Sequence, residues 1–335
     1  MIITKTPFRM SFFGGGTDIE KYFREYGGAV LSTTFDKYCY VNVRHLPPFF
    51  DYSTELSYSK TERVTKIDEI IHPAIRNAMK MLNMYDIRLT YEADLPARSG
   101  LGTSSSFAVG MLNAFYALKG KYVDKKRLAD EAIYLERTMC NESGGWQDQI
   151  AASFGGMNRI EFNKDGTYEV RPVIIHPDRK TELNNRLVMF FTGFTRFSSE
   201  IQKENLVGYS EKVKQLQKIY SLVNDAEAIL TDKHGALDDF GRLLDATWKL
   251  KRSTGSAISS NSIDSLYAKG IEAGALGGKL LGAGGGGFMV FYVQPEKKQA
   301  LMDVMKDMLY VPFKFEDGGT QVIYYSPETI EAKEN

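Results

Sequence analysis

A glycine- and hydroxyl-rich loop leads directly into a helix-forming segment, and this transition constrains the fold more than any other part of the chain. The loop spans residues 95–106, with glycines at 100 and 102 and four hydroxyl residues at 103–106. Apolar residues then recur through 107–118 with the periodicity of a helix. A helix N-terminus offers unpaired N–H groups and the positive end of the macrodipole, and glycine lets the backbone approach a ligand closely. The pattern predicts a phosphate-binding loop, and a serine-capped helix after an ordinary turn is the alternative.

Composition excludes several classes of protein. The 335 residues suffice for two domains, and the 42 basic and 42 acidic residues cancel, which argues against a nucleic-acid partner. The two cysteines, Cys39 and Cys140, are far apart and lack metal-ligand spacing. Neither a signal peptide nor an apolar stretch of membrane-spanning length is present, so we expect a cytoplasmic protein with no membrane partner.

The first half of the chain mixes strands and helices. Alternating apolar residues predict strands at 37–44 and 87–91, and helical periodicity predicts helices at 67–82 and 124–140. The sequence Asn-Lys-Asp-Gly at 163–166 predicts a hairpin that joins strands at 157–162 and 167–175.

The composition changes after a polar, charged segment at 178–185, and the chain becomes mostly helical. The expected elements are a strand at 187–191, helices at 199–230 and 237–251, a strand at 288–293, a helix at 297–309 and a final pair of strands. We predict a domain boundary at residue 183, which gives domains 1–183 and 184–335.

Three glycine-rich segments, at 7–18, 95–106 and 282–287, punctuate the chain. A Walker A motif is absent, because Lys279 follows a glycine pair but precedes leucine, and the protein-kinase signatures are absent too. The content and order of the three segments resemble the three motifs of the GHMP small-molecule kinases, and the resemblance covers nearly the whole chain. One departure is Arg98, where the family usually has glycine. Arg98 either contacts a phosphate or faces solvent.

This resemblance implies an α/β (α+β) fold of two domains, with the active site in the cleft between them. The N-terminal domain would be ribosomal-protein-like and the C-terminal domain ferredoxin-like. The loop would bind ATP through Pro96, Arg98, Ser99, Gly100, Leu101, Gly102, Thr103, Ser104 and Ser105.

The resemblance also implies the catalytic residues. Asp148, in a Gly-x-x-Asp-Gln context, matches the base that receives the proton of the acceptor hydroxyl; its alternative role is a carboxylate at a helix start. Arg9 matches a basic residue that stabilises the charge of Asp148 and of the transferred group, and otherwise is a surface charge at a strand edge. Ser104 and Glu136 match the ligands of Mg²⁺, whereas Glu131 lies on another face of the same helix.

Further residues of the motifs would contact a sugar. Thr17 and Asp18 match a pair that binds substrate hydroxyls, although Asp18 could also cap a helix at 19–26. The other substrate residues would be Gly15, Gly16, Gly145, Gln147 and Gly285. The third glycine run would pack against the phosphate loop or the acceptor, or form a flexible turn before the strand at 288–293.

The segment Gly-Gly-Gly-Thr-Asp at 14–18 differs from the Gly-Glu-His-Thr-Asp of galactokinases and is similar to the heptose kinases and the fucokinase-like branch. Within these, the resemblance is nearest to D-glycero-D-manno-heptose 7-phosphate kinases, which make the 1,7-bisphosphate on the way to a nucleotide-activated heptose such as GDP-heptose. The 7-phosphate would need a second anion site, for which Arg196, Lys203 and Arg98 are candidates.

Other functions remain open at this point. A kinase for an unphosphorylated sugar such as fucose or galactose is one, and a non-catalytic nucleotide or sugar sensor is another. The combination of Arg9, Glu136 and Asp148 argues against a sensor, because a binding module needs no acceptor base. The aromatic residues Phe49, Phe50 and Tyr52 would form either a homodimer interface or the rim of a pocket.

Overall fold

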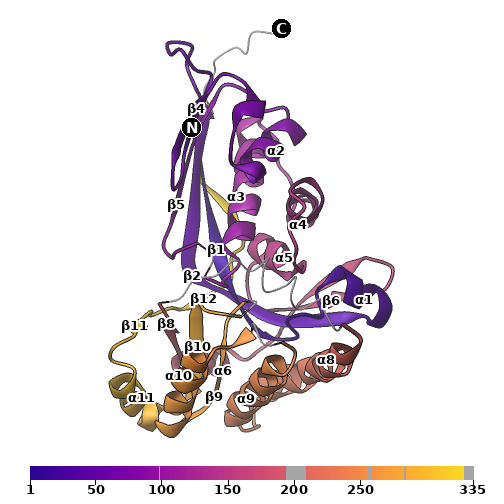
Figure 1. Ribbon diagram of the computed structural model, residues 1–335, viewed down its shortest axis with the longest axis vertical. Coiled ribbons are helices and arrows are strands. Elements are labelled where there is room, and N and C mark those ends of the chain that lie inside the picture. Colours follow the sequence, from indigo (N-terminus) through magenta and orange to yellow (C-terminus); the bar gives the residue numbers. More distant parts are fainter. Residues whose placement is uncertain (98, 194–208, 256–257, 283, 328–335) are drawn as a thin grey trace.

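The computed structural model describes residues 1–97, 99–193, 209–255, 258–282 and 284–327. Two β-sheets organise these residues, one of nine strands and one of four. Figure 1 shows the larger sheet extending along the length of the molecule, with the smaller sheet and its helices at one end. This mixed α/β architecture agrees with the fold class expected from the sequence.

The long strand β2 (Gly28–His45) is the centre of the larger sheet. The main strand order of this sheet is β13 (Gln321–Tyr325), β1 (Ile2–Phe13), β2, β5 (Ile87–Ala93), β3 (Thr54–Ser57) and β4 (Thr61–Val64). The first part of β2 also pairs with β6 (Asn158–Phe162), which forms a hairpin with β7 (Tyr168–Pro172). The hairpin predicted around residues 163–166 is thereby confirmed.

Helices cover one face of this sheet, as Figure 1 shows for α2 (Pro73–Met81), α3 (Thr103–Leu118), α4 (Lys125–Ile133) and α5 (Gln147–Phe154). Helix α3 is buried on nearly every side because it packs against β1 and β2 while α4 and α5 cover it. Its largely apolar sequence therefore belongs to the core.

The smaller sheet has the order β11 (Leu309–Tyr310), β8 (Leu187–Phe191), β10 (Phe288–Val293) and β9 (Ala275–Leu280). The helices of this part are α6 (Pro177–Arg186), α8 (Tyr209–Thr231), α9 (Asp238–Arg252), α10 (Asn261–Glu272) and α11 (Lys298–Val304). Helix α1 (Glu20–Tyr26) instead packs on the larger sheet, where Phe23 stacks on Phe162 of β6. The strands expected at 187–191 and 288–293 are confirmed.

An aromatic cluster joins the two parts of the molecule. Phe240 of α9 makes edge contacts with Phe12 and Phe13 of β1, at ring-centroid distances of 5.3 and 5.1 Å. All three side chains are fully buried. The end of β1, which lies within the first glycine-rich segment, is therefore held against α9.

Three elements differ from the expectations. The helix predicted at 67–82 is a short 3₁₀ turn, η1 (Ile67–Glu69), followed by α2, because Pro73 starts a new helix and lacks an N–H. The helix predicted at 124–140 ends in a π-helical segment, η2 (Tyr134–Met139). The helix expected at 297–309 is shorter, since α11 ends at Val304 after the 3₁₀ turn η4 (Pro295–Lys297).

The prediction of a final pair of strands is also wrong in one respect. Strands β12 (Phe315–Glu316) and β13 do not pair with each other but join the larger sheet, β12 on β2 and β13 on β1. Residue 183 lies in α6, between β7 of the larger sheet and β8 of the smaller one. The boundary at 183 stays a prediction.

The aromatic cluster gives a prediction for stability. Phe240→Ala should lower the free energy of unfolding by about 3–5 kcal/mol, because it removes a fully buried ring and leaves a cavity between α9 and β1. Urea unfolding followed by tryptophan fluorescence measures this change. Phe49→Ala is the control: Phe49 is 87% exposed, so a change within about 0.5 kcal/mol is expected. A similar loss for both variants would contradict the assignment.

Candidate active site

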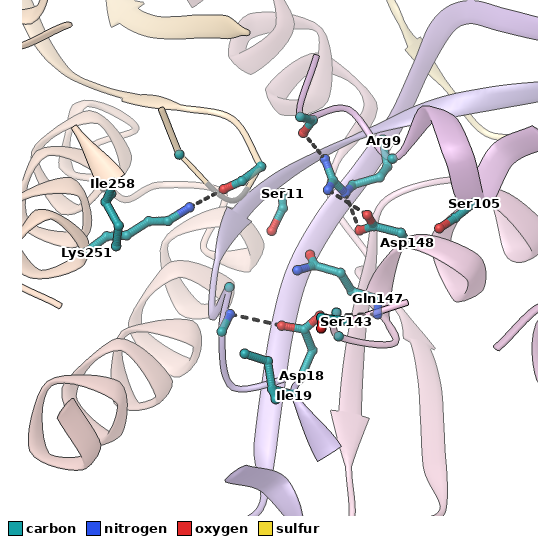
Figure 2. A pocket seen from close by; sticks show the side chains of 18 of the residues that line it. Arg9, Ser11, Asp18, Ile19, Ser105, Ser143, Gln147, Asp148, Lys251 and Ile258 are labelled. Atoms are coloured by element: carbon teal, nitrogen blue, oxygen red, sulfur yellow. Dashed lines mark hydrogen bonds and ion pairs between the residues drawn. The ribbon is translucent and has the colours of Figure 1, made fainter. Parts of the chain in front are cut away.

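A cavity of about 220 Å³ lies where residues of both sheets and their helices meet. All three glycine-rich segments contribute to its wall, and α9 supplies Lys251. Figure 2 shows Arg9, Asp148 and Gln147 on one side of this space, Lys251 on the other, and Ser11 between them. The sequence segments predicted to act together are thus brought together by the fold.

An ion pair between Arg9 and Asp148 is the best-defined contact in the cavity. The Arg9 guanidinium donates from Nε to Asp148 Oδ1 at 2.7 Å and from Nη2 to Oδ2 at 3.0 Å. Arg9 is almost fully buried in β1, whereas Asp148, in the first turn of α5, is partly open to the cavity. Such a two-point contact fixes the orientation of the carboxylate, and its exposed edge can still accept a proton.

The predicted phosphate loop packs on this pair. Arg9 Nη1 donates to the carbonyl oxygen of Gly100 at 2.6 Å, and the backbone N–H of Arg9 donates to the carbonyl oxygen of Leu101. Gly100 has a φ of +80°, and a Cβ on it would overlap the carbonyl oxygen of Leu281. Gly282 in turn lies against Gly100, so the second and third glycine-rich segments touch backbone to backbone.

Asp18 occupies the opposite end of the cavity wall from the loop. Its carboxylate accepts backbone N–H groups of Gly16 at 2.9 Å and Gln147 at 3.4 Å. Burial raises the pKa of Asp18, and the negative charge of Asp148 raises it further, while the two N–H groups act in the opposite direction. A Cβ on Gly145 would overlap this carboxylate, so Asp18 can lie in its position only because residue 145 is glycine.

Glu136 is a buried carboxylate beside the start of α3. It accepts hydrogen bonds from the Ser104 hydroxyl at 2.8 Å, from the Ser105 hydroxyl at 2.7 Å and from the Gln149 amide. It lies in η2, where π-helical geometry changes the direction of side chains relative to a regular helix. Among the described residues, no three of His, Cys, Asp and Glu cluster as a metal site of their own.

Most of the predicted site residues line the cavity. These are Arg9, Gly15, Gly16, Asp18, Gly100, Gly102, Thr103, Ser104, Ser105, Glu136, Gly145, Gln147 and Asp148. Asp18 does not cap α1, since Ile19 is at the N-cap position and no side chain caps that helix. Glu131, which the sequence places in the same helical segment as Glu136, does not line the cavity. It accepts hydrogen bonds from Tyr116 and Arg127.

The other predicted site residues that the structure describes do not line the cavity. The Thr17 hydroxyl is fully buried and lies 2.8 Å from the carbonyl oxygen of Gly14 and 3.0 Å from that of Ala29, so it holds the turn rather than facing the cavity. Ser99 and Leu101 are buried, and Pro96 is exposed outside the cavity. Gly285 donates its N–H to Ile258, while its neighbours line the cavity. Arg98, Arg196 and Lys203 lie outside the described residues.

Sequence reasoning missed the residues that the second sheet and α9 contribute. Lys251 donates to the carbonyl oxygen of Gly282, and Lys279 Nζ donates to the carbonyl oxygens of Ser11 and Phe12, both at 2.8 Å. Lys279 thereby ties β9 to the end of β1. Its position after a glycine pair was visible in the sequence, but Lys251 has no local signal because its neighbours are those of an ordinary amphipathic helix.

Family comparisons agree with the geometry. The model of the GHMP kinases N terminal domain matches residues 69–156, and the GHMP kinases C terminal model matches residues 226–310. The chain is 32% identical over 338 residues to a D-glycero-alpha-D-manno-heptose 7-phosphate kinase of Campylobacter jejuni, covering 96% of this chain and 98% of that protein. The chain belongs to the GHMP kinases.

Two further relatives show the range of the likeness. A crystal structure of a D-glycero-D-manno-heptose 1-phosphate kinase from Bacteroides thetaiotaomicron aligns with a TM-score of 0.79 at 25% identity, covering 97% of this chain and 99% of that one. A galactokinase of Pyrococcus furiosus is 24% identical over 341 residues, covering 91% of this chain and 92% of that protein. The expected family and the expected class of enzyme, a GHMP-family phosphotransferase, are confirmed. In the part of the chain that the structure describes, no helix is long and apolar enough to cross a membrane.

The contact between Gly145 and Asp18 can be tested by a double-mutant cycle. Gly145→Ala should lower the free energy of unfolding by about 1–3 kcal/mol, because the new methyl group displaces a buried carboxylate from its N–H partners. In an Asp18→Ala background the same change should cost little, since the three atoms nearest to the new Cβ all belong to the Asp18 carboxyl group. Thermal or urea unfolding measures both. Equal penalties in the two backgrounds would contradict the contact.

Proposed function

We propose that this protein transfers the terminal phosphoryl group of ATP to the anomeric hydroxyl of D-glycero-D-manno-heptose 7-phosphate, forming the 1,7-bisphosphate. The observation that carries the proposal is the carboxylate of Asp148, oriented by Arg9 and open to a cavity that the glycine-rich loop and Asp18 also line. The likeness to a heptose 7-phosphate kinase over nearly the whole chain supports the choice of acceptor.

Different residues of the cavity are suited to the nucleotide, to the transferred group and to the sugar. The N–H groups at the start of α3 and of the loop before it suit the phosphates of the nucleotide. Asp148 is placed to receive the proton of the acceptor hydroxyl, and Arg9 to stabilise the negative charge that spreads over the transferred group. Asp18 and Gln147 suit the sugar, because a buried carboxylate and an amide can bind several hydroxyl groups.

Glu136 and Ser104 would hold Mg²⁺. Their oxygens lie 2.8 Å apart beside the predicted phosphate loop, and magnesium commonly takes one or two protein oxygens with waters and substrate phosphates. The absence of a larger acidic cluster among the described residues fits this sparse coordination. When bound, the ion would neutralise charge on the nucleotide phosphates. A cytoplasmic location and a homodimer stay predictions; Phe49 and Phe50 are exposed and do not line the cavity.

Turnover with a panel of acceptors tests the proposal. The panel holds the heptose, its 7-phosphate, its 1-phosphate, fucose and galactose, each with ATP and Mg²⁺, and ADP release is measured. We expect the heptose 7-phosphate to give the highest kcat/KM, and the product to carry the new phosphate at the anomeric carbon by phosphorus NMR. A preference for the 1-phosphate, or for fucose or galactose, would overturn the assigned acceptor. ADP release with none of the five would overturn the whole assignment.

Asp148→Asn tests the acceptor base. The amide retains the shape of the side chain but cannot take up the proton, so kcat should fall by a factor of about 10²–10⁴ while the dissociation constant of the nucleotide changes little. Asp178→Asn is the matched control, because Asp178 also lies in the first turn of a helix but is almost fully exposed and outside the cavity. Activity retained in Asp148→Asn would assign the base to another residue.

A further inference from the structure

Lys251 places an ammonium group in the cavity, and no carboxylate in the described part of the chain forms an ion pair with it. Its side chain comes from the last turn of α9, lines the cavity and donates to the carbonyl oxygen of Gly282. The other lysine of the same turn, Lys249, is exposed and pairs with Asp245 at 2.7 Å. An ammonium group has three N–H donors, so after the bond to the Gly282 carbonyl it can still donate to a further acceptor.

Charged groups of both signs act on Lys251 in the cavity. Arg9, Asp18, Asp148 and Lys279 are the groups whose charges act on it or feel its charge. Asp148 is already paired with Arg9, and Asp18 is held by backbone N–H groups. Burial, together with the charge of Arg9, lowers the pKa of Lys251 to about 8, and burial lowers the pKa of Lys279 as well.

A second, independent observation comes from Ser11, which lines the same cavity. The Ser11 hydroxyl is buried and lines the cavity, and it has no hydrogen-bond partner among the described residues. Ser11 lies between Lys251 and the pair of Arg9 and Asp148 in Figure 2, and its own carbonyl oxygen accepts from Lys279. Buried hydroxyl groups are almost always hydrogen-bonded, so this one indicates a ligand atom at this place in the cavity.

We propose that Lys251 and the Ser11 hydroxyl bind a phosphate group in this cavity. This proposal rests on the proposed function, since it assigns a lysine of α9 and a serine of β1 to the binding of a substrate phosphate. Two sources carry the same chemistry: the terminal phosphate of the nucleotide, and the phosphate that the acceptor already bears. In both cases an ammonium and a hydroxyl donate to the phosphate oxygens.

Calorimetry with Lys251→Met measures the contact directly. The probes are a non-hydrolysable ATP analogue, the heptose 7-phosphate and the unphosphorylated heptose. We expect the affinity for one phosphate-bearing probe to fall about 10- to 100-fold, because one charge-assisted hydrogen bond is lost. A fall for the ATP analogue assigns Lys251 to the nucleotide, and a fall for the heptose phosphate with none for the heptose assigns it to the acceptor. Unchanged affinity for both phosphate-bearing probes overturns the proposal.

Matched variants separate binding from folding. Lys249→Met changes the same turn of α9 outside the cavity and should bind all probes as the parent does. Lys251→Met should not lower the unfolding midpoint of the ligand-free protein, since it removes a charge that burial disfavours. A lowered midpoint with unaltered affinities would mean a structural role only. Ser11→Ala should weaken binding of the same probe as Lys251→Met.

The pH dependence of the binding affinity separates a phosphate contact from a purely structural role, which would leave that dependence unchanged. Affinity for the phosphate-bearing probe should decline as the pH rises through about 8, because Lys251 then loses its proton. Lys251→Arg should bind without this decline, since guanidinium stays charged. A decline that is identical in Lys251→Arg would overturn the proposal. If the parent binds the heptose phosphate in a Lys251-dependent way but releases no ADP, the proposed function fails and this inference stands.

Discussion

The bidentate contact between Arg9 and Asp148 sets the geometry of the cavity. It joins the central sheet to the first turn of α5, and Arg9 reaches the phosphate loop with its remaining donor group. One guanidinium therefore fixes three segments that are distant in the chain. A flexible lysine at residue 9 could neutralise the same charge but could not hold both carboxylate oxygens and the Gly100 carbonyl in one plane.

Glycine is what lets the other segments approach this contact. Gly100 and Gly282 bring two backbones together without side chains, and Gly145 leaves room for the carboxylate of Asp18. The aromatic contacts of Phe240 with Phe12 and Phe13 then hold α9 against the end of β1. The backbone contacts of the glycines and the ring contacts of Phe240 hold the larger and the smaller sheet together, so residues from both parts can face one substrate.

Much of this arrangement could be predicted from the sequence, because the three glycine-rich segments carry local signals. The roles of Arg9, Asp148 and Glu136 followed from their resemblance to family motifs, and the structure brings all three to one cavity. Lys251 could not be found in this way, since only tertiary packing carries it to Gly282. For Thr17 the sequence motif predicted a contact that the structure does not show. The motif indicated contact with the substrate, whereas the fold buries the hydroxyl against backbone carbonyl groups.

The pairing of β1 with β13 has a consequence for how the chain is made. Ile2 lies opposite Tyr325, so β1 receives its outer neighbour only after the strands of the smaller sheet have been synthesised. Until then the backbone of β1 on that side has no strand to bond, and an unpaired edge invites association with other chains. The strands of the smaller sheet lie between β1 and β13 in the sequence, so this sheet can form before β13 is available to pair with β1.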